Sequence, residues 1–183
     1  MAGQNMNVLS LILIDHVKVM NTIKELEAVP PNDTDTKKDR FNFLKALINT
    51  HTKAEEKVVY PALKQFIPDT INVSLEEHKV TDDLLKNLDS TDMGDPCWKA
   101  RLLVLWNVTV AHMNTEEGPV FDVARANISE SQLISIGQSF QQSKGTAGIA
   151  LSGTRAQASA SDSGRGSGQG YSRDFKTSMG RTS

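Results

Sequence analysis

Two stretches of the chain share one pattern: "HTKAEEKVVY" at residues 51–60 and "HMNTEEGPVF" at residues 112–121. Each contains a His, three residues, a Glu-Glu pair, two residues, a Val and an aromatic residue. On an α-helix, positions i and i+4 lie about 40° apart around the axis and roughly 6 Å apart along it. Each stretch therefore presents an imidazole and a carboxylate on one helix face. The pairs are His51 with Glu55 and His112 with Glu116.

The two other histidines extend this pattern into a duplicated unit. His16 precedes His51 by 35 residues. In the second copy, the separation from His78 to His112 is 34 residues. Residues around the first histidine of each copy also match, in the pairs Leu13 with Leu75, Asp15 with Glu77, Ile23 with Leu85 and Leu26 with Leu88. The chain looks like a repeated helical hairpin, which gives a bundle approximate two-fold symmetry.

Apolar residues recur at three- and four-residue spacing through the first 142 residues, with breaks that contain Pro or Gly. Helices are predicted over about residues 7–27, 36–67 and 71–89, then from Pro96 through His112, and from Ser129 to about Gln142. No stretch shows the strict alternation of a half-buried strand. The expected fold class is all-α, an up-down-up-down four-helix bundle with a short fifth helix and a disordered C-terminal tail.

A change in composition divides the chain near residue 143. Residues 143–183 hold 8 of the 12 Gly and 9 Ser, with 6 basic and 2 acidic residues, a net charge of +4. Residues 1–142 carry 14 basic and 20 acidic residues, a net charge of -6. We expect a helical bundle over residues 1–142 and a flexible Gly/Ser-rich basic tail over 143–183, whose protein partner is unknown.

The overall composition is that of an ordinary soluble protein, with 38% hydrophobic residues and a net charge of -2. It lacks the basic excess typical of nucleic-acid binding. The single cysteine, Cys97, forms no internal disulfide and suits a reducing compartment. Asp15 and His16 interrupt the N-terminal apolar run well short of a bilayer span. The sequence predicts a cytoplasmic protein with neither nucleic acid nor membrane as partner.

The repeated histidines and glutamates predict a metal centre if they face the bundle interior. Two buried carboxylates cost several kcal/mol unless they are protonated, hydrated or paired with cations. Two metal ions satisfy them, because two bridging carboxylates and four imidazoles give each metal four protein bonds. Mixed imidazole and carboxylate donors suit iron best, and manganese or zinc less well. The candidate metal ligands are His16, His51, Glu55, His78, His112 and Glu116.

These motifs resemble the hemerythrin-like HHE cation-binding domain family. The resemblance covers about residues 7–126 and rests on "DH" ending at His16, "HTKAEE" from His51, "EEH" ending at His78 and "HMNTEE" from His112. It implies a four-helix bundle with a non-haem di-iron centre. In that centre His16 and His51 hold one metal, His78 and His112 hold the other, and Glu55 and Glu116 bridge them.

The chain departs from the oxygen-carrying members of that family at two places. The carriers have a fifth His one turn away on the third helix, where this chain has Ser74 and Asp82. They also use an Asp five residues after the last His, where Glu117 stands. Glu116 is preferred over Glu117 as the bridging ligand because it repeats Glu55. With four histidines, one metal has fewer protein ligands, which favours sensing or turnover over oxygen transport.

The neighbours of the candidate ligands are interpreted as structural residues. Glu56 and Glu117 lie about 100° further round the helix than the preceding Glu, so both are expected to face solvent. The acidic residues that precede His16 and His78 are also expected to face outward. Tyr60 and Phe121 come nine residues after a His, on the opposite side of an ideal helix, and are expected to pack.

Three functions are compatible with the sequence. The first is a di-iron protein that binds O2 or a related small oxidant for sensing, storage or detoxification. The second is a di-iron enzyme that acts on hydrogen peroxide or nitric oxide, so the sequence leaves open whether the protein is an enzyme. The third is a metal-free helical interaction module. The small ligand, the metal in the cell and the oligomeric state are not determined by the sequence.

Overall fold

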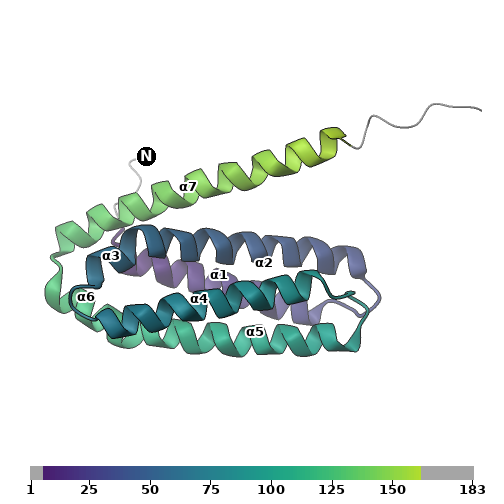
Figure 1. The fold of residues 1–183 in the computed structure, drawn as a ribbon, viewed down its shortest axis with the longest axis horizontal. Helices are drawn as coiled ribbons and strands as arrows, with labels where there is room; N and C mark the ends of the chain where they lie inside the picture. The colour runs from purple at the N-terminus through teal and green to yellow at the C-terminus, as the bar shows by residue number, and fades with distance from the viewer. Residues whose placement is uncertain (1–5, 162–183) are drawn as a thin grey trace, which may run out of the picture.

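Four long helices form an antiparallel bundle in the computed structural model, which describes residues 6–161 and side chains up to residue 145 (Figure 1). They are α1 Val8–Ala28, α2 Thr34–Ala54, α4 Pro68–Asp89 and α5 Pro96–Thr115. Helix α1 packs on α2 and α5, and α4 packs on α5 and α2. No strand occurs within residues 6–161. The predicted all-α, up-down-up-down bundle is confirmed.

Short segments extend α2 and α5 past the points where these helices end. A π-helical turn, η1 Glu55–Val59, leads from α2 into α3 Tyr60–Leu63. In the second half, η2 Glu116–Val120 leads from α5 into α6 Phe121–Asn127. Both halves therefore change helix type at the same position of the repeat, directly at the glutamate that follows the His by four residues.

Capping side chains fix where the helices begin, because they accept hydrogen bonds from backbone N–H groups that lack a partner within the helix. Asn7, Asp33 and Asp95 accept such bonds at the starts of α1, α2 and α5. Before the fifth helix, the Ser129 N–H donates to Gln132 Oε1 at 3.0 Å, and the Gln132 N–H donates to Ser129 Oγ at 3.4 Å. This reciprocal pair is a capping box.

The fifth helix, α7 Glu130–Ser161, is longer than the short helix expected and runs past the predicted boundary at residue 143. Residues 143–161 contain no Pro and several Ala, so nothing in them stops a helix sharply. The rest of the predicted tail, residues 162–183, lies outside the described residues. Helix α7 packs on α1, α2 and η1 (Figure 1). A β-carbon at Gly137 would lie 2.6 Å from the Met6 carbonyl oxygen, so glycine permits this close crossing.

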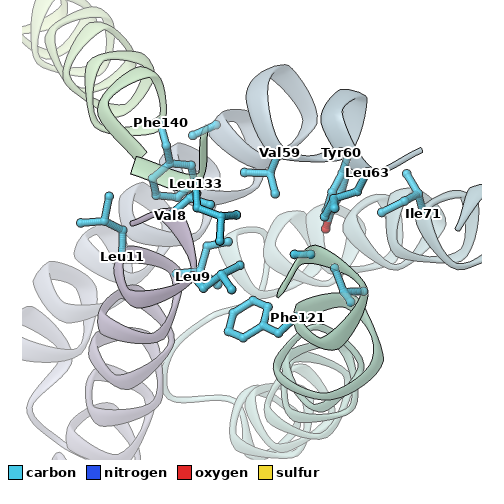
Figure 2. Packing of buried hydrophobic residues seen from close by; sticks show 14 residues of the cluster. Val8, Leu9, Leu11, Val59, Tyr60, Leu63, Ile71, Phe121, Leu133 and Phe140 are labelled. Carbon is cyan, nitrogen blue, oxygen red and sulfur yellow. The ribbon is translucent and has the colours of Figure 1, made fainter. Parts of the chain in front are cut away.

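Two apolar clusters fill the bundle. The first joins the ends of α1 and α4 to η1, α3, η2, α6 and α7, and contains Tyr60, Phe121 and Phe140 (Figure 2). The second fills the opposite end and contains Phe41 and Trp98. Each large apolar side chain buried in this way contributes about 1.5–3 kcal/mol to folding. No described helix is both long and apolar enough to cross a membrane.

Candidate metal centre

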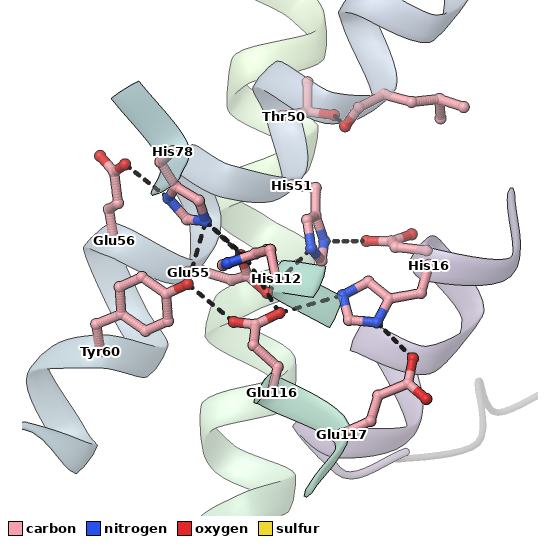
Figure 3. A network of polar contacts seen from close by, with 12 residues as sticks. His16, Thr50, His51, Glu55, Glu56, Tyr60, His78, His112, Glu116 and Glu117 are labelled. Atoms are coloured by element: carbon pink, nitrogen blue, oxygen red, sulfur yellow. Dashed lines mark hydrogen bonds and ion pairs between the residues drawn. The ribbon is translucent and has the colours of Figure 1, made fainter. Parts of the chain in front are cut away.

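A layer of buried polar side chains separates the two apolar clusters (Figure 3). It contains all six predicted ligands: His16 from α1, His51 from the end of α2, Glu55 from η1, His78 from α4, His112 from the end of α5 and Glu116 from η2. Glu55 is 0% exposed and Glu116 is 1% exposed, which is rare for carboxylates. Residues from six elements thus meet at one place, as the repeat predicts.

The donor atoms of this layer form two groups that share Glu55. The His16 group consists of His16, His51, Glu55 and Glu116, and the His78 group consists of Glu55, His78 and His112. Within each group the donor atoms lie within 4.8 Å of one another. Glu55 Oε1 lies 3.0 Å from His51 Nε2, whereas Glu55 Oε2 lies 3.4 Å from His78 Nε2. Each oxygen of Glu55 therefore faces one group, which is the arrangement that a bridging carboxylate needs.

Several donor atoms in the layer have no hydrogen-bond partner. Eight buried side-chain nitrogen and oxygen atoms within the described residues lack one, and five of these belong to the layer. They are His16 Nε2, His51 Nε2, both oxygens of Glu55 and Oε2 of Glu116. A buried polar atom left in this way costs about 1–3 kcal/mol. A cation gives all five a partner, so the residues present fit metal ions held by nitrogen and oxygen donors.

Each of the four imidazoles is held at Nδ1 by a carboxylate on its far side from the layer. The Nδ1 to oxygen distances are 2.8 Å for His16 with Glu117, 3.2 Å for His51 with Asp15, 2.9 Å for His78 with Glu56, and 2.8 Å for His112 with Glu77. A carboxylate that accepts from Nδ1–H fixes the ring orientation and leaves Nε2 as the electron-pair donor. All four Nε2 atoms are thereby prepared to bind metal.

These four carboxylates correct the expectation that they only face solvent. Asp15 is buried, with 5% of its surface exposed. The side chains of Glu56 and Glu117 are 42% and 40% exposed, yet each contacts an imidazole. The sequence contains a signal for this supporting role, because each of the four residues is directly adjacent to a predicted ligand, at equivalent positions in the two copies of the repeat. In each Glu-Glu pair, therefore, the first Glu enters the layer and the second supports a histidine from another helix.

Tyr60 lies in the layer, although the sequence predicted only a packing role on the opposite side of the helix. The π turn explains the difference. In η1 the Tyr60 N–H donates to the Glu55 carbonyl, an i→i+5 bond that brings these two residues to one face. In an α-helix they are about 140° apart. Since η2 repeats the turn, Pro119 alone does not cause it: the first copy has Val58 at that position.

The Tyr60 hydroxyl contacts both halves of the layer (Figure 3). It donates a hydrogen bond to Glu116 Oε1 at 2.8 Å and lies 3.1 Å from His78 Nε2. The phenol ring stacks on the His78 imidazole, with centroids 5.4 Å apart. Phe121 occupies the equivalent position in the second copy and has no hydroxyl. The centre is therefore asymmetric, with a phenol oxygen beside the group that has fewer donors.

At the positions where the carriers' fifth His and Asp stand, the structure distinguishes the available side chains. Ser74 is completely buried but offers a hydroxyl in place of an imidazole, and the Asp82 side chain is 56% exposed. Glu116 Oε2 lies 3.2 Å from His16 Nε2, inside the layer, whereas Glu117 contacts the outer nitrogen of the same ring. The geometry favours Glu116 over Glu117 as the bridging carboxylate.

Electrostatic interactions across the layer shift the pKa values of its groups. Burial alone lowers the pKa of the His51 imidazole, but the Glu55 charge and the hydrogen bond to Asp15 outweigh it and raise that pKa to about 10. Burial opposes ionisation of Glu55, yet His51 and His78 hold the pKa of its carboxyl well below the usual value. Burial and the charge of Glu55 raise the pKa of Tyr60 far above its ordinary value. The layer thus strongly favours cations beside its carboxylates.

Comparison with protein families gives a match that covers most of the bundle. The family model of the hemerythrin HHE cation binding domain matches residues 7–124, a range that contains all six predicted ligands and ends before α7 begins. The matched range therefore corresponds to the duplicated hairpins.

Two individual proteins are similar to this chain. A protein described as a DNA nickase, from Nostoc sp. (strain PCC 7120 / SAG 25.82 / UTEX 2576), is 28% identical over 130 residues, which is 70% of this chain. The chain spans only 36% of the length of that relative. A solved hemerythrin HHE cation binding domain-containing protein from Mycobacterium kansasii superposes with a TM-score of 0.72 at 20% identity, over 79% of this chain and 89% of that one. The second likeness shows the fold.

Proposed function

Because the chain belongs to the hemerythrin HHE cation binding domain family, we propose that its polar layer holds two iron ions and, through them, binds O2 or a related small oxidant. The biological role proposed is sensing, storage or detoxification of that oxidant. One observation carries the proposal: buried imidazole nitrogens and carboxylate oxygens without hydrogen-bond partners face one another across the layer. These donors suit a metal cation, and the family description says only that the domain binds a cation. That the cation is iron is part of the proposal.

The proposed ligands divide between the two metal positions as the groups do. His16 and His51 would hold one ion and His78 and His112 the other, with Glu55, which belongs to both groups, and Glu116 shared between the two positions. Glu116 belongs to the His16 group, and its Oε1 accepts the Tyr60 hydrogen bond on the side of the His78 group. When bound, a pair of iron ions supplies reversible electron transfer to or from a small oxygen- or nitrogen-containing ligand.

The surrounding protein orients the donors and limits access of water. The four carboxylates at the Nδ1 atoms hold each ring in one orientation. The two apolar clusters close the layer from both ends of the bundle. A surface hollow between α2 and α4 is lined by Glu56, His78 and Leu75 among others, and offers a small molecule a route toward the His78 group.

The test is metal analysis of the purified, air-exposed protein together with its absorption spectrum. We expect about two iron ions per chain and the absorption bands of an oxo-bridged diferric pair. His51→Ala is expected to lower the iron content to about one ion per chain and to remove the bands of the pair, because it deletes a donor of the His16 group only. A protein without stoichiometric iron, or with metal content and stability unaffected by His51→Ala, refutes the proposal and favours the metal-free interaction module.

An enzyme that acts on hydrogen peroxide or nitric oxide is the second candidate. The observation that favours it is the missing fifth imidazole: beside His78 the chain has the buried hydroxyl of Ser74, so one metal position has fewer strong donors than in the oxygen carriers. A metal held by fewer protein ligands keeps more positions open for a substrate. Peroxide consumption by the iron-loaded protein is expected to exceed that of the Glu55→Ala variant, and equal rates exclude this candidate for peroxide.

Tyr60→Phe tests whether the phenol oxygen tunes the centre. We expect the bundle to fold normally, because Phe121 fills the equivalent position. Loss of the hydrogen bond to Glu116 is expected to weaken metal binding about 10-fold and to change the visible spectrum. Isothermal titration with Fe(II) under nitrogen, and spectra after oxidation, measure the two effects. An unchanged affinity and spectrum limit Tyr60 to packing.

A further inference from the structure

Helix α7 covers one outer face of the first hairpin. Phe140 and Lys144 of α7 lie over Leu11 and Asp15 of α1, around a small hollow at this face. The Phe140 ring meets the His51 imidazole edge-on, with centroids 6.0 Å apart, and Phe140 itself is 1% exposed. Lys144 Nζ donates to Asp15 Oδ2, the same oxygen that binds His51 Nδ1. The α7 helix therefore supports one histidine of the layer from outside.

The equivalent face of the second hairpin is open within the described residues. Adding 62 to the α1 positions that line the α7 contact gives four residues of α4: Val73, Glu76, Glu77 and Val80 correspond to Leu11, Ile14, Asp15 and Lys18. These four, with Asn72 and with Val108 and Ala111 of α5, line a largely apolar groove. We call it the α4/α5 groove. The duplication thus places an equivalent surface on the other side of the bundle, where Glu76 stands in place of Ile14 and Val80 in place of Lys18.

The exposed fractions of equivalent residues show that α7 covers the face of the first hairpin and that no described residue covers the face of the second. Leu11 is 9% exposed under α7, whereas its counterpart Val73 is 54% exposed. Val80 in the same groove is 50% exposed. Val73 and Val80 lie on the same face of α4, about two turns apart, and with the apolar residues of α5 they form an exposed apolar patch of the kind that often marks an interaction site.

The charges of the groove indicate what kind of helix fits. Glu77 contacts His112 Nδ1 at 2.8 Å, as Asp15 contacts His51 Nδ1, so each carboxylate orients the imidazole beside it. The Asp15 side chain is 6% exposed beneath Lys144, but the Glu77 side chain is 29% exposed. Among residues 6–145, no lysine or arginine pairs with Glu77, whereas the neighbouring Glu76 pairs with Lys79. The groove therefore presents one carboxylate that lacks the ammonium group found on the other face.

We propose that the α4/α5 groove binds an amphipathic helix of a partner polypeptide, which places apolar side chains on Val73 and Val80 and a Lys or Arg on Glu77. The proposed partner is a separate polypeptide that occupies the groove as α7 occupies the face of α1 and α2. Helix α7 is the template for its chemistry, with apolar residues and a lysine four positions after an aromatic residue. Binding adds a cation to the carboxylate that orients His112, as Lys144 does at Asp15.

The probe for this groove is a helix-stapled, fluorescent peptide with the sequence of residues 129–145, titrated into the full-length protein. Stapling removes the ordering cost that weakens binding of short peptides. We expect saturable binding that falls at least about 10-fold with Val80→Glu, because a charge then replaces an apolar contact. A peptide carrying the change Lys144→Glu is expected to lose affinity to a similar degree. Leu103→Glu is the matched control, since Leu103 is exposed on α5 but does not line the groove.

Absence of saturable binding overturns the proposal, as does binding that Val80→Glu leaves unchanged or that Leu103→Glu weakens equally. Binding that is lost with Lys18→Glu and kept with Val80→Glu also overturns it, because the peptide then replaces α7 on the first hairpin. The titration is repeated on chelator-treated protein, whose helical content is checked by circular dichroism. The groove does not need metal, so peptide binding without metal separates failure of this proposal from failure of the proposed di-iron function. Only the coupling to His112 rests on that function.

Discussion

Glu55→Gln is expected to lower iron content from about two ions per chain to less than one, the largest effect of any single substitution in the layer. Glu55 is the one residue common to both donor groups, and each of its oxygens faces a different group. The amide keeps the size of the side chain but offers one neutral oxygen where the carboxylate offers two charged ones. Affinity for both ions is therefore expected to fall by more than about 100-fold, beyond the 10- to 100-fold effects typical of residues that support a ligand.

The control for this variant is its sequence neighbour, Glu56→Gln. Glu56 also meets a histidine of the layer, but from outside, at the Nδ1 atom of His78. We expect Glu56→Gln to weaken the binding of only one iron ion, by about 10-fold, and to leave the binding of the other unchanged. Metal analysis after dialysis against a weak chelator distinguishes the two variants. Equal iron retention by Glu55→Gln and the unaltered protein contradicts a bridging role for Glu55.

Most of the fold and the six central residues follow from the repeat. The i,i+4 spacing places His51 with Glu55 and His112 with Glu116 on one face, because the backbone N–H of each Glu still donates to the carbonyl of the His four residues earlier, as in an α-helix. The same argument extends to His16, which the duplication places opposite them. Short-range helix geometry therefore suffices wherever the backbone remains α-helical, and the structure brings these side chains together as predicted.

At the π turns, α-helical spacing no longer predicts which side chains share a face. A rotation of about 100° per residue places Tyr60 on the wrong side of the helix, and a single i→i+5 bond moves it beside Glu55. Nothing in "EEKVV" of η1 distinguishes this turn from an α-helical one by propensity alone. The two turns place two buried glutamates in the layer, and such turns are frequent at functional sites.

The supporting carboxylates and α7 depend on contacts between helices, which spacing within one helix does not reveal. Asp15 bonds a histidine 36 positions away and Lys144 lies 129 positions from Asp15. The periodicity of a single helix predicts that Asp15 faces outward, and the composition places Lys144 in the tail. The adjacency of all four carboxylates to predicted ligands was visible in the sequence, and two-fold symmetry then relates Asp15 to Glu77 and Glu56 to Glu117.

Removal of metal is expected to reverse the pH dependence of stability above neutral pH. In the metal-free protein, protonated His51 is stabilised by Glu55 and Asp15, and its pKa is about 10 against an ordinary value of 6.5. This contribution is complete below about pH 6.5 and is lost as pH rises toward 10. We expect the free energy of unfolding to fall by on the order of 2 kcal/mol between about pH 6.5 and 9, a decrease in Tm of about 5 °C.

At acidic pH the stability of the metal-free protein depends on carboxyl groups, whose protonation destabilises the fold. The carboxyls of Glu55 and Asp15 have pKa values below their ordinary ones, so their contribution is present at neutral pH and is lost as pH falls below the ordinary values of 4.5 and 3.8. Metal-free protein is therefore expected to be most stable between about pH 5 and 6.5. In the iron-loaded protein, metal replaces the protons on the imidazoles, so a rise in pH favours binding and stability.

Thermal unfolding of chelator-treated and iron-loaded protein, measured from pH 4 to 10 in about one-unit steps, compares the two curves directly. His51→Gln in the metal-free state is the informative variant, because it removes one titrating group but keeps a polar side chain of similar reach. Its Tm is expected to fall less between about pH 6.5 and 9 than that of the unaltered metal-free protein. Part of the fall remains, because burial of His78 is likewise outweighed by the carboxylates around it, which raise the pKa of that imidazole. If the metal-free protein and this variant lose stability equally over that range, the decline arises from groups other than His51. If the unaltered protein declines more than the variant, the carboxylates of the layer stabilise a proton on His51, and metal and protons compete for that imidazole.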